Sequence, residues 1–98
     1  MAQFKETAVA ERRKETRYDT GNCTAEILLT EPEMILRGNV VDVSRSGLRL
    51  RTHCHLEAQR MLTVRFGAIV VAGRVRYCTL NQDNTFDTGV LICDINLA

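Results

Sequence analysis

Six short apolar runs, separated by turn-forming residues, constrain the fold of this chain more than any other feature of its sequence. The clearest run, Gly47 to Thr52, reads G-L-R-L-R-T and alternates leucine with arginine. A period of two places Leu48 and Leu50 on one face of an extended strand and the arginines on the other face. No helical pattern alternates with these runs, so a doubly wound nucleotide-binding fold is not expected.

The other runs are bounded by similar turn signals. Glu31-Pro32-Glu33 and the segment 81–84 are rich in turn-forming residues, and Gly38-Asn39 is expected to form a β-bulge. A chain of 98 residues has room for one domain, and six strands in it predict an all-β fold, a small six-stranded antiparallel β-barrel. The predicted strands span 23–30, 34–43, 47–52, 61–66, 69–77 and 86–95.

Residues 1–19 differ from the rest of the chain because they are rich in charge and hold few large apolar side chains, chiefly Phe4 and Val9. Such a segment cannot form a core of its own. We therefore expect a polar, flexible N-terminal arm over 1–19 and the barrel over 20–98, with Thr20-Gly21-Asn22 as the break between them.

Composition excludes several classes of function. The 13 basic residues are balanced by 12 acidic residues, and a net charge of +1 excludes a protein that coats DNA or RNA through bulk charge. No apolar run approaches the roughly 20 residues that cross a bilayer as a helix, so membrane insertion is not expected. Eleven of the basic residues are arginine, which favours planar, bidentate binding of phosphates and guanine edges. A genomic bias toward arginine codons is the alternative explanation.

The four cysteines, none of them in a C-x-x-C pair, indicate a reduced protein rather than a disulfide framework. The first 20 residues lack the apolar stretch of a signal peptide, so a cytoplasmic location is expected. Cys54, Cys78 and Cys93 are expected to be small core residues. His53 and His55 would share one face of a strand, but no third ligand can be placed, and no metal site is expected.

A basic cluster lies where the predicted arm meets the barrel. From Arg12 to Arg17 the sequence R-R-K-E-T-R carries four positive charges and one negative charge. Arg13 and Arg17 are four residues apart, so they would share one face of a helix, or close on a ligand from one side of a loop. A solvated basic patch without a ligand is the alternative interpretation.

A second cluster, Asp42-Val43-Ser44-Arg45-Ser46-Gly47, forms a polar turn between two predicted strands. The Asp42 carboxylate can accept hydrogen bonds from N1–H and the exocyclic amine of guanine, and the Ser44 hydroxyl can bond a ligand or brace the turn. Gly47 permits a positive φ or a close approach of the backbone. The alternative is an Asx-type turn that satisfies only its own backbone.

In their order and spacing the two clusters resemble the motifs of the PilZ domain family. That family carries R-x-x-x-R in an N-terminal loop, followed on the barrel by D/N-x-S-x-x-G. The matching segments are Arg13–Arg17 and Asp42–Gly47. Gly73–Tyr77 and Thr88–Ile92 resemble the closing strands of the family, so the resemblance covers nearly the whole chain.

The chain departs from the family pattern at three places. It has Gln59-Arg60 where many members have a turn glycine, and Ile92 where an aromatic residue is common. It stops at Ala98, so little or no C-terminal helix is expected. None of these departures touches the two motifs.

The resemblance implies binding of the bacterial second messenger cyclic di-GMP, a dianion with two guanines. By this resemblance Arg13 and Arg17 hold guanine edges and phosphates. Asp42 and Ser44 hold the guanine that lies on the barrel, and Gly47 allows the turn its shape.

The resemblance also implies how such a domain would work. Arg12, directly before the first motif, suits a stacked pair of ligand molecules. The ligand would fix the N-terminal arm against the barrel and present a new surface to an unidentified effector protein. No cofactor besides the ligand is expected, and the protein is expected to be a monomer or a weak dimer.

Functions of other classes fit the sequence less well. A PilZ-like adaptor that binds proteins but no nucleotide is the main alternative, although such members typically lack the arginine motif. A barrel that binds single-stranded nucleic acid needs exposed aromatic side chains, and most aromatic residues of this chain lie in apolar patterns expected to be core. An enzyme is not expected, because no Ser-His-Asp set, phosphate loop or paired carboxylates can be recognised. The solvated exterior of the barrel is expected to include Arg49, Arg51, Arg74 and Arg76.

Overall fold

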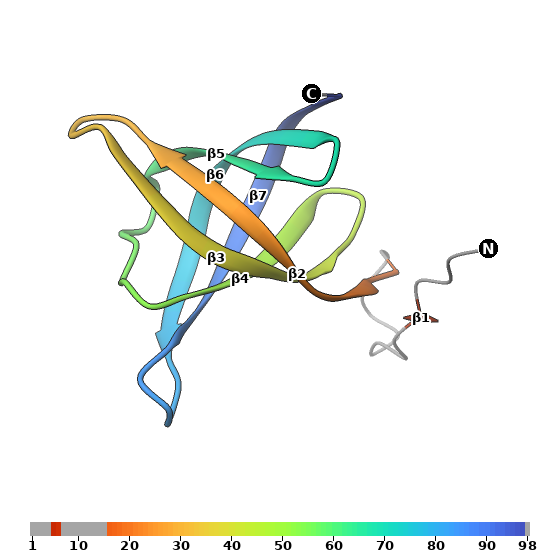
Figure 1. Ribbon diagram of the computed structural model, residues 1–98, viewed down its shortest axis with the longest axis horizontal. Helices are drawn as coiled ribbons and strands as arrows, with labels where there is room; N and C mark the ends of the chain where they lie inside the picture. Colours follow the sequence, from red (N-terminus) through yellow and green to blue (C-terminus); the bar gives the residue numbers. More distant parts are fainter. Residues whose placement is uncertain (1–4, 7–15, 98) are drawn as a thin grey trace.

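The computed structural model describes residues 5–6 and 16–97, and over these residues the chain forms strands, turns and loops, with no helix. No described segment therefore provides a long apolar helix that could span a membrane. Seven strands form one antiparallel sheet (Figure 1). They are β1 (Lys5–Glu6), β2 (Tyr18–Leu29), β3 (Met34–Val43), β4 (Gly47–Thr52), β5 (Met61–Phe66), β6 (Ile69–Leu80) and β7 (Phe86–Leu97).

Six of these strands close into a ring. Along the sheet the order is β2-β3-β4-β7-β6-β5, and β5 then pairs with β2 through Leu62–Arg65 and Glu26–Leu29. Figure 1 shows this ring, with the short β1 beside the start of β2. The predicted all-β fold with six antiparallel strands is confirmed. The observed strands reach further than predicted, to Tyr18 in β2, Leu80 in β6 and Leu97 in β7.

Alternation along the strands fills the ring with apolar side chains. Leu48 and Leu50, which were predicted to face inward, are at most 1% exposed. Burial of apolar surface contributes roughly 25 cal/mol per Å², so this core is the main source of stability. The buried apolar side chains are Ala25, Ile27, Leu29, Val40, Leu48, Leu50, Leu56, Leu62, Val64, Val71, Val75 and Val90.

One predicted irregularity is misplaced. The β-bulge expected at Gly38-Asn39 is wrong, because β2 and β3 pair there without a register shift, with Ala25 opposite Gly38. Gly38 instead allows two backbones to approach closely, since a Cβ at this position would lie 2.7 Å from the carbonyl oxygen of Arg51. The break expected at Thr20-Gly21-Asn22 is a register shift inside β2, which continues through these residues.

A bulge in β3 decides the direction of Asp42. The pairing of β3 with β4 passes from Val40–Leu50 to Asp42–Arg49, so Val41 is an extra residue on β3. Side chains alternate along a strand, and without the extra residue Asp42 would point inward like Val40. The bulge turns Asp42 to the outer face beside Arg49.

A matching bulge occurs in β6. Its pairing with β7 passes from Val75–Val90 to Tyr77–Gly89, so Arg76 is an extra residue on β6. The shift turns Tyr77 to the outer face, where 48% of the residue is exposed. Most aromatic residues were expected to lie in the core, and Tyr77 does not lie there.

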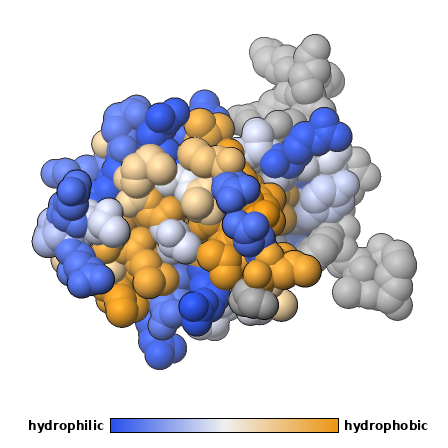
Figure 2. Space-filling view, turned by 90° about the horizontal axis from the view of Figure 1, so that it is seen from above, coloured by the Kyte–Doolittle hydropathy of each residue, from blue (hydrophilic) through white to orange (hydrophobic). Residues whose placement is uncertain are grey.

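The end of β7 leaves apolar surface open. A third shift, at Cys93, places Ile95 opposite Val71 and Leu97 opposite Ile69, yet Ile95 and Leu97 are 52% and 81% exposed. Ile95 also lines an apolar groove of about 320 Å³ between the β5–β6 hairpin and the start of β2. Figure 2, which views the molecule from above, shows hydrophobic side chains gathered on one face between hydrophilic ones.

The cysteines are less buried than predicted. All four thiols are free, and Cys54 and Cys93 are exposed, so their assignment to the core is wrong. Cys54 lies in the loop after β4, and Cys93 lies at the register shift of β7. Cys78 is half-buried, and its sulfur accepts hydrogen bonds from Leu56 N at 3.4 Å and from the Thr88 hydroxyl at 3.2 Å.

An ion pair ties the β6–β7 hairpin to β4. Asp87 lies opposite Arg51 and accepts hydrogen bonds at 3.1 Å from Arg51 Nε and from Asn81 Nδ2. Burial raises the pKa of Asp87, but these hydrogen bonds outweigh it and lower the pKa below the ordinary value of 3.8. The charged carboxylate therefore stabilises the fold above about pH 4, and this contribution is lost as the pH falls through the lowered pKa.

Asp87→Asn should lower the free energy of unfolding by about 1 kcal/mol near pH 7, because Arg51 loses a charged partner. Chemical denaturation at about pH 7 and about pH 2 measures the difference from the parent, which should shrink at the lower pH. Asp94→Asn, which removes an exposed carboxylate from the same strand, is the matched control. An equal loss in both variants would contradict this role of Asp87.

Candidate functional site

Outward-facing residues of four neighbouring strands form one row. Asp42 on β3 lies opposite Arg49 on β4, Arg49 lies opposite Gly89 on β7, and Gly89 lies opposite Tyr77 on β6. Directly opposed residues on antiparallel strands point to the same face, with Cβ atoms about 4.5–5.5 Å apart. The row therefore assembles a carboxylate, a guanidinium group and a phenol ring on the outer surface.

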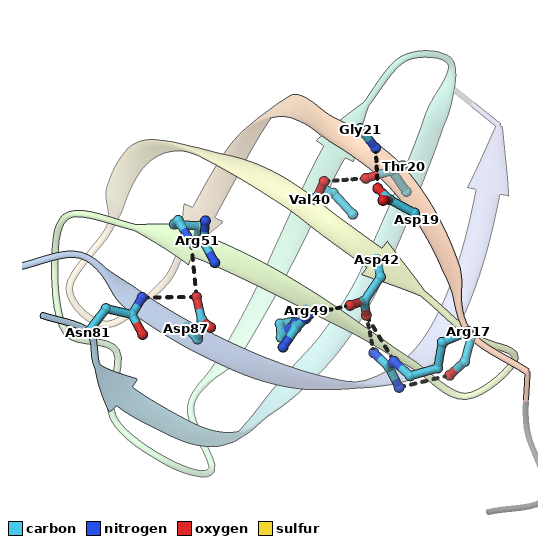
Figure 3. A network of polar contacts seen from close by, with 11 residues as sticks. Arg17, Asp19, Thr20, Gly21, Val40, Asp42, Arg49, Arg51, Asn81 and Asp87 are labelled. Carbon is cyan, nitrogen blue, oxygen red and sulfur yellow. Dashed lines mark hydrogen bonds and ion pairs between the residues drawn. The ribbon is translucent and has the colours of Figure 1, made fainter. Parts of the chain in front are cut away.

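The Asp42 carboxylate is the centre of a polar network (Figure 3). Its Oδ1 accepts hydrogen bonds from Arg17 Nε at 2.8 Å and Arg17 Nη2 at 2.6 Å, and its Oδ2 accepts from Arg49 Nη2 at 2.6 Å. Only 10% of the Asp42 side chain is exposed. A carboxylate this buried requires paired charges, which the two arginines supply.

The turn after Asp42 is braced by its own backbone and by β7. Ser44 N donates to the Gly47 carbonyl oxygen at 2.7 Å, and the Ser44 hydroxyl donates to the same oxygen at 3.2 Å. A Cβ on Gly47 would lie 3.0 Å from the Val90 carbonyl oxygen, so glycine lets the turn lie close to β7. Arg17 Nη1 donates to the Ser44 hydroxyl at 3.4 Å. Ser44 thus braces the turn, whereas both oxygens of Asp42 bind arginines.

A hollow of about 220 Å³ lies on the outer face beside this network. Arginines from three parts of the chain line it: Arg17 before β2, Arg49 on β4 and Arg76 on β6. The ring of Tyr77 also lines it and lies over Gly89, where a Cβ would be 2.1 Å from Cε2 of the ring. Guanidinium groups and an aromatic ring around a hollow suit a ligand that carries a planar base and an anion.

One hydrogen-bond donor of Arg49 is not used within the described part of the chain. Its Nη2 pairs with Asp42, but its buried Nε is, among the described residues, the one buried side-chain nitrogen or oxygen without a hydrogen-bond partner. An unpaired buried donor costs about 1–3 kcal/mol, and such groups in native structures are often functional. Since Arg49 lines the hollow, a ligand there can supply the missing acceptor.

The structure brings four of the predicted site residues together. Arg17, Asp42 and Ser44 are in direct contact, and Gly47 closes their turn. Arg12 and Arg13 lie outside the described residues.

Other residues of the site were missed by the sequence analysis. The alternation placed Arg49 and Arg76 on the exterior, where the structure has them, but it did not predict that Arg49 pairs with Asp42. Its place two residues after Gly47 is the signal that could have indicated its role. No comparable signal marked Tyr77, whose direction depends on the bulge in β6.

The two histidines lie apart from this network. The ring of His55 stands edge-on to Phe86, with ring centroids 5.6 Å apart. Over residues 16–97, no three His, Cys, Asp or Glu side chains are grouped so that they could hold a metal ion.

Comparison with known families agrees with the two motifs and the fold. A sequence model of the PilZ domain matches residues 11–97, nearly the whole chain. The chain belongs to the PilZ domain family. A search of curated proteins gave no match. PilZ domains act in general as receptors for cyclic di-GMP or as adaptors, which are binding roles rather than catalytic ones.

Two glycines of this PilZ domain should respond differently to alanine. In Gly89→Ala the new Cβ meets the Tyr77 ring, which is half-exposed and can swing into solvent, so the loss of stability should stay below about 1 kcal/mol. In Gly73→Ala the Cβ would lie 2.6 Å from both the Leu91 carbonyl oxygen and Val90 Cγ1, which cannot move aside. That variant should lose about 1–3 kcal/mol.

Chemical denaturation of the two variants measures this difference, and NMR spectra report the tyrosine rings. Only Gly89→Ala should shift the Tyr77 ring resonances strongly. Equal losses of stability would contradict the assignment of Gly89 as the support of the Tyr77 ring.

Proposed function

We propose that this PilZ domain is a receptor for cyclic di-GMP. The observation that carries the proposal is the contact of Arg17 with Asp42 and Ser44, which joins residues of both sequence motifs beside a hollow lined by arginine. Guanidinium groups next to the Asp42 carboxylate favour a ligand that carries both phosphates and guanine edges.

Each residue has a role that matches its chemistry. Asp42 accepts hydrogen bonds from N1–H and the amino group of one guanine, the Ser44 hydroxyl bonds the same base, and Gly47 keeps the turn close to β7. Arg13 and Arg17 bind phosphates or the O6 and N7 edge of guanine, where one bidentate pair discriminates by ~1–3 kcal/mol. A guanidinium plane also stacks on a purine, which a lysine cannot do well.

The hollow extends this set of contacts. Arg76 and Tyr77 line it together with Arg17 and add a cation and an aromatic ring. Arg12, next to the first motif, supports the uptake of a second, stacked ligand molecule. Phosphate contacts make the binding sensitive to salt.

Signalling follows from where the two motifs lie. Arg12 and Arg13 belong to the predicted N-terminal arm, while Asp42 and Ser44 belong to the ring. A ligand held by both groups fixes the arm against the ring, and ordering the arm subtracts several kcal/mol, of order 2–5, from the gross interaction energy. The fixed arm changes the surface that an effector protein meets.

Calorimetric titration of cyclic di-GMP into the purified protein tests the receptor function. We expect a Kd in about the micromolar range, which corresponds to roughly −8 kcal/mol. Arg17→Ala and Asp42→Ala should each weaken binding by about tenfold or more, because each removes a charged partner. Raised salt should weaken the parent as well.

Arg65→Ala is the matched control for the loss of charge. Arg65 lies on β5, is 58% exposed and reaches Glu26 only at 3.9 Å, so its removal should change the Kd by less than about twofold. If the parent protein shows neither heat of binding nor a thermal shift with cyclic di-GMP, the receptor function is refuted. The role of a protein adaptor is then left. Equal weakening by Arg65→Ala would refute the site.

A further inference from the structure

The two arginines on Asp42 use different oxygens. Arg17 places two neighbouring donors on Oδ1, from Nε at 2.8 Å and Nη2 at 2.6 Å, and Arg49 places one donor on Oδ2 at 2.6 Å. With 10% of the Asp42 side chain exposed, little of the carboxylate is left uncovered. A base that binds Oδ1 therefore has to displace Arg17.

Guanine offers a carboxylate the same pattern of donors that Arg17 offers. The Nε–H and Nη2–H groups of a guanidinium are neighbouring and coplanar. N1–H and one amino N–H of guanine are neighbouring and coplanar as well. Adenine has a donor beside an acceptor on the corresponding edge, and a carboxylate cannot satisfy that acceptor.

The backbone decides which arginine can leave. Arg49 lies within β4, with Asp42 opposite it on one side and Gly89 on the other. Arg17 precedes β2 and belongs to no strand. Arg17 also lines the hollow, so its guanidinium is already close to the place where an anion would bind.

We propose that guanine replaces Arg17 on Oδ1 when the ligand binds, while Arg49 stays on Oδ2 as a positioning residue. Arg17 then binds the ligand's phosphate or its O6 and N7 edge. The exchange rests on the proposed binding of cyclic di-GMP. It adds which groups Asp42 binds before and after the ligand arrives. A buried carboxylate oxygen that loses its donors is costly, so a base that lacks two neighbouring donors cannot replace Arg17 on Oδ1.

Titration with nucleosides tests the exchange. Guanosine carries the guanine edge without a phosphate, and it has to displace Arg17 in the parent but not in Arg17→Ala. Measured by NMR, guanosine should bind Arg17→Ala about tenfold more tightly than it binds the parent. Inosine, which lacks the amino group, and adenosine should show no such gain.

The affinity for cyclic di-GMP should change in the opposite direction. This ligand uses Arg17 after the exchange, so Arg17→Ala should weaken its binding about tenfold. Damage to the fold would weaken the binding of both ligands. A merely structural role of Arg17 therefore does not produce changes in affinity of opposite sign for guanosine and cyclic di-GMP. Arg49→Lys keeps the charge but loses the planar guanidinium, and it should weaken the binding of both ligands.

The parent protein provides a second measurement that needs no variant. The Nε–H of Arg17, bonded to a buried carboxylate, should exchange slowly with water in NMR spectra, and saturation with cyclic di-GMP should shift this resonance and change its exchange rate by about tenfold. Arg17→Lys identifies the resonance by its disappearance.

The outcomes separate the two proposals. Absence of cyclic di-GMP binding to the parent refutes the receptor function and the exchange with it. If cyclic di-GMP binds, but guanosine gains nothing in Arg17→Ala or the Arg17 resonance is unchanged at saturation, the exchange is wrong and the receptor function stands.

Discussion

The buried carboxylate of Asp42 is the constraint on which the rest of the site depends. A charge with so little exposure persists only beside opposite charges that also satisfy its hydrogen bonds. Arg49 comes from the adjacent strand, and Arg17 comes from a position 25 residues earlier in the chain. The ion pair between Arg17 and Asp42 thus holds the residue before β2 against the end of β3. It also brings the two sequence motifs into contact, so fold stability and site geometry depend on the same ion pairs.

Two bulges of one residue each give the outer face its chemistry. Val41 and Arg76 each interrupt the alternation of a strand once, so that Asp42 and Tyr77 face outward while the same strands still bury their apolar residues. A slip of one residue turns every following side chain to the other face. Bulges near binding sites commonly redirect a side chain in this way, and the two bulges on either side of Arg49 produce one continuous row.

The strands were predictable from the sequence, whereas the bulges were not. Each strand of the ring buries one face, and the resulting period of two is visible in the residues themselves. The position of an extra residue depends instead on which backbone lies alongside: Gly38 suggested a bulge, but it accommodates the carbonyl of Arg51, and the extra residue is Val41. The motif residues of the site could be predicted from their spacing. The outward direction of Arg49 followed from the alternation of its strand, but its partner did not, because the bulge in β3 turns Asp42 toward it. The direction of Tyr77 could not be predicted, because it follows from the bulge in β6.

Local charge, rather than net charge, decides what this face can bind. The chain carries a net charge of +1, yet among the described residues three guanidinium groups line one hollow next to the Asp42 carboxylate, an excess of two positive charges within this part of the chain. Such a cluster acts over a short range, which suits the small dianion proposed as the ligand better than a long polyanion. The proposed exchange strengthens this preference. In this proposal a neutral guanine takes the place of the charged Arg17 on Asp42, and the released guanidinium becomes available to the phosphates of the same ligand. Binding of the base to Asp42 would therefore free the Arg17 guanidinium, which is the cation that the phosphate needs.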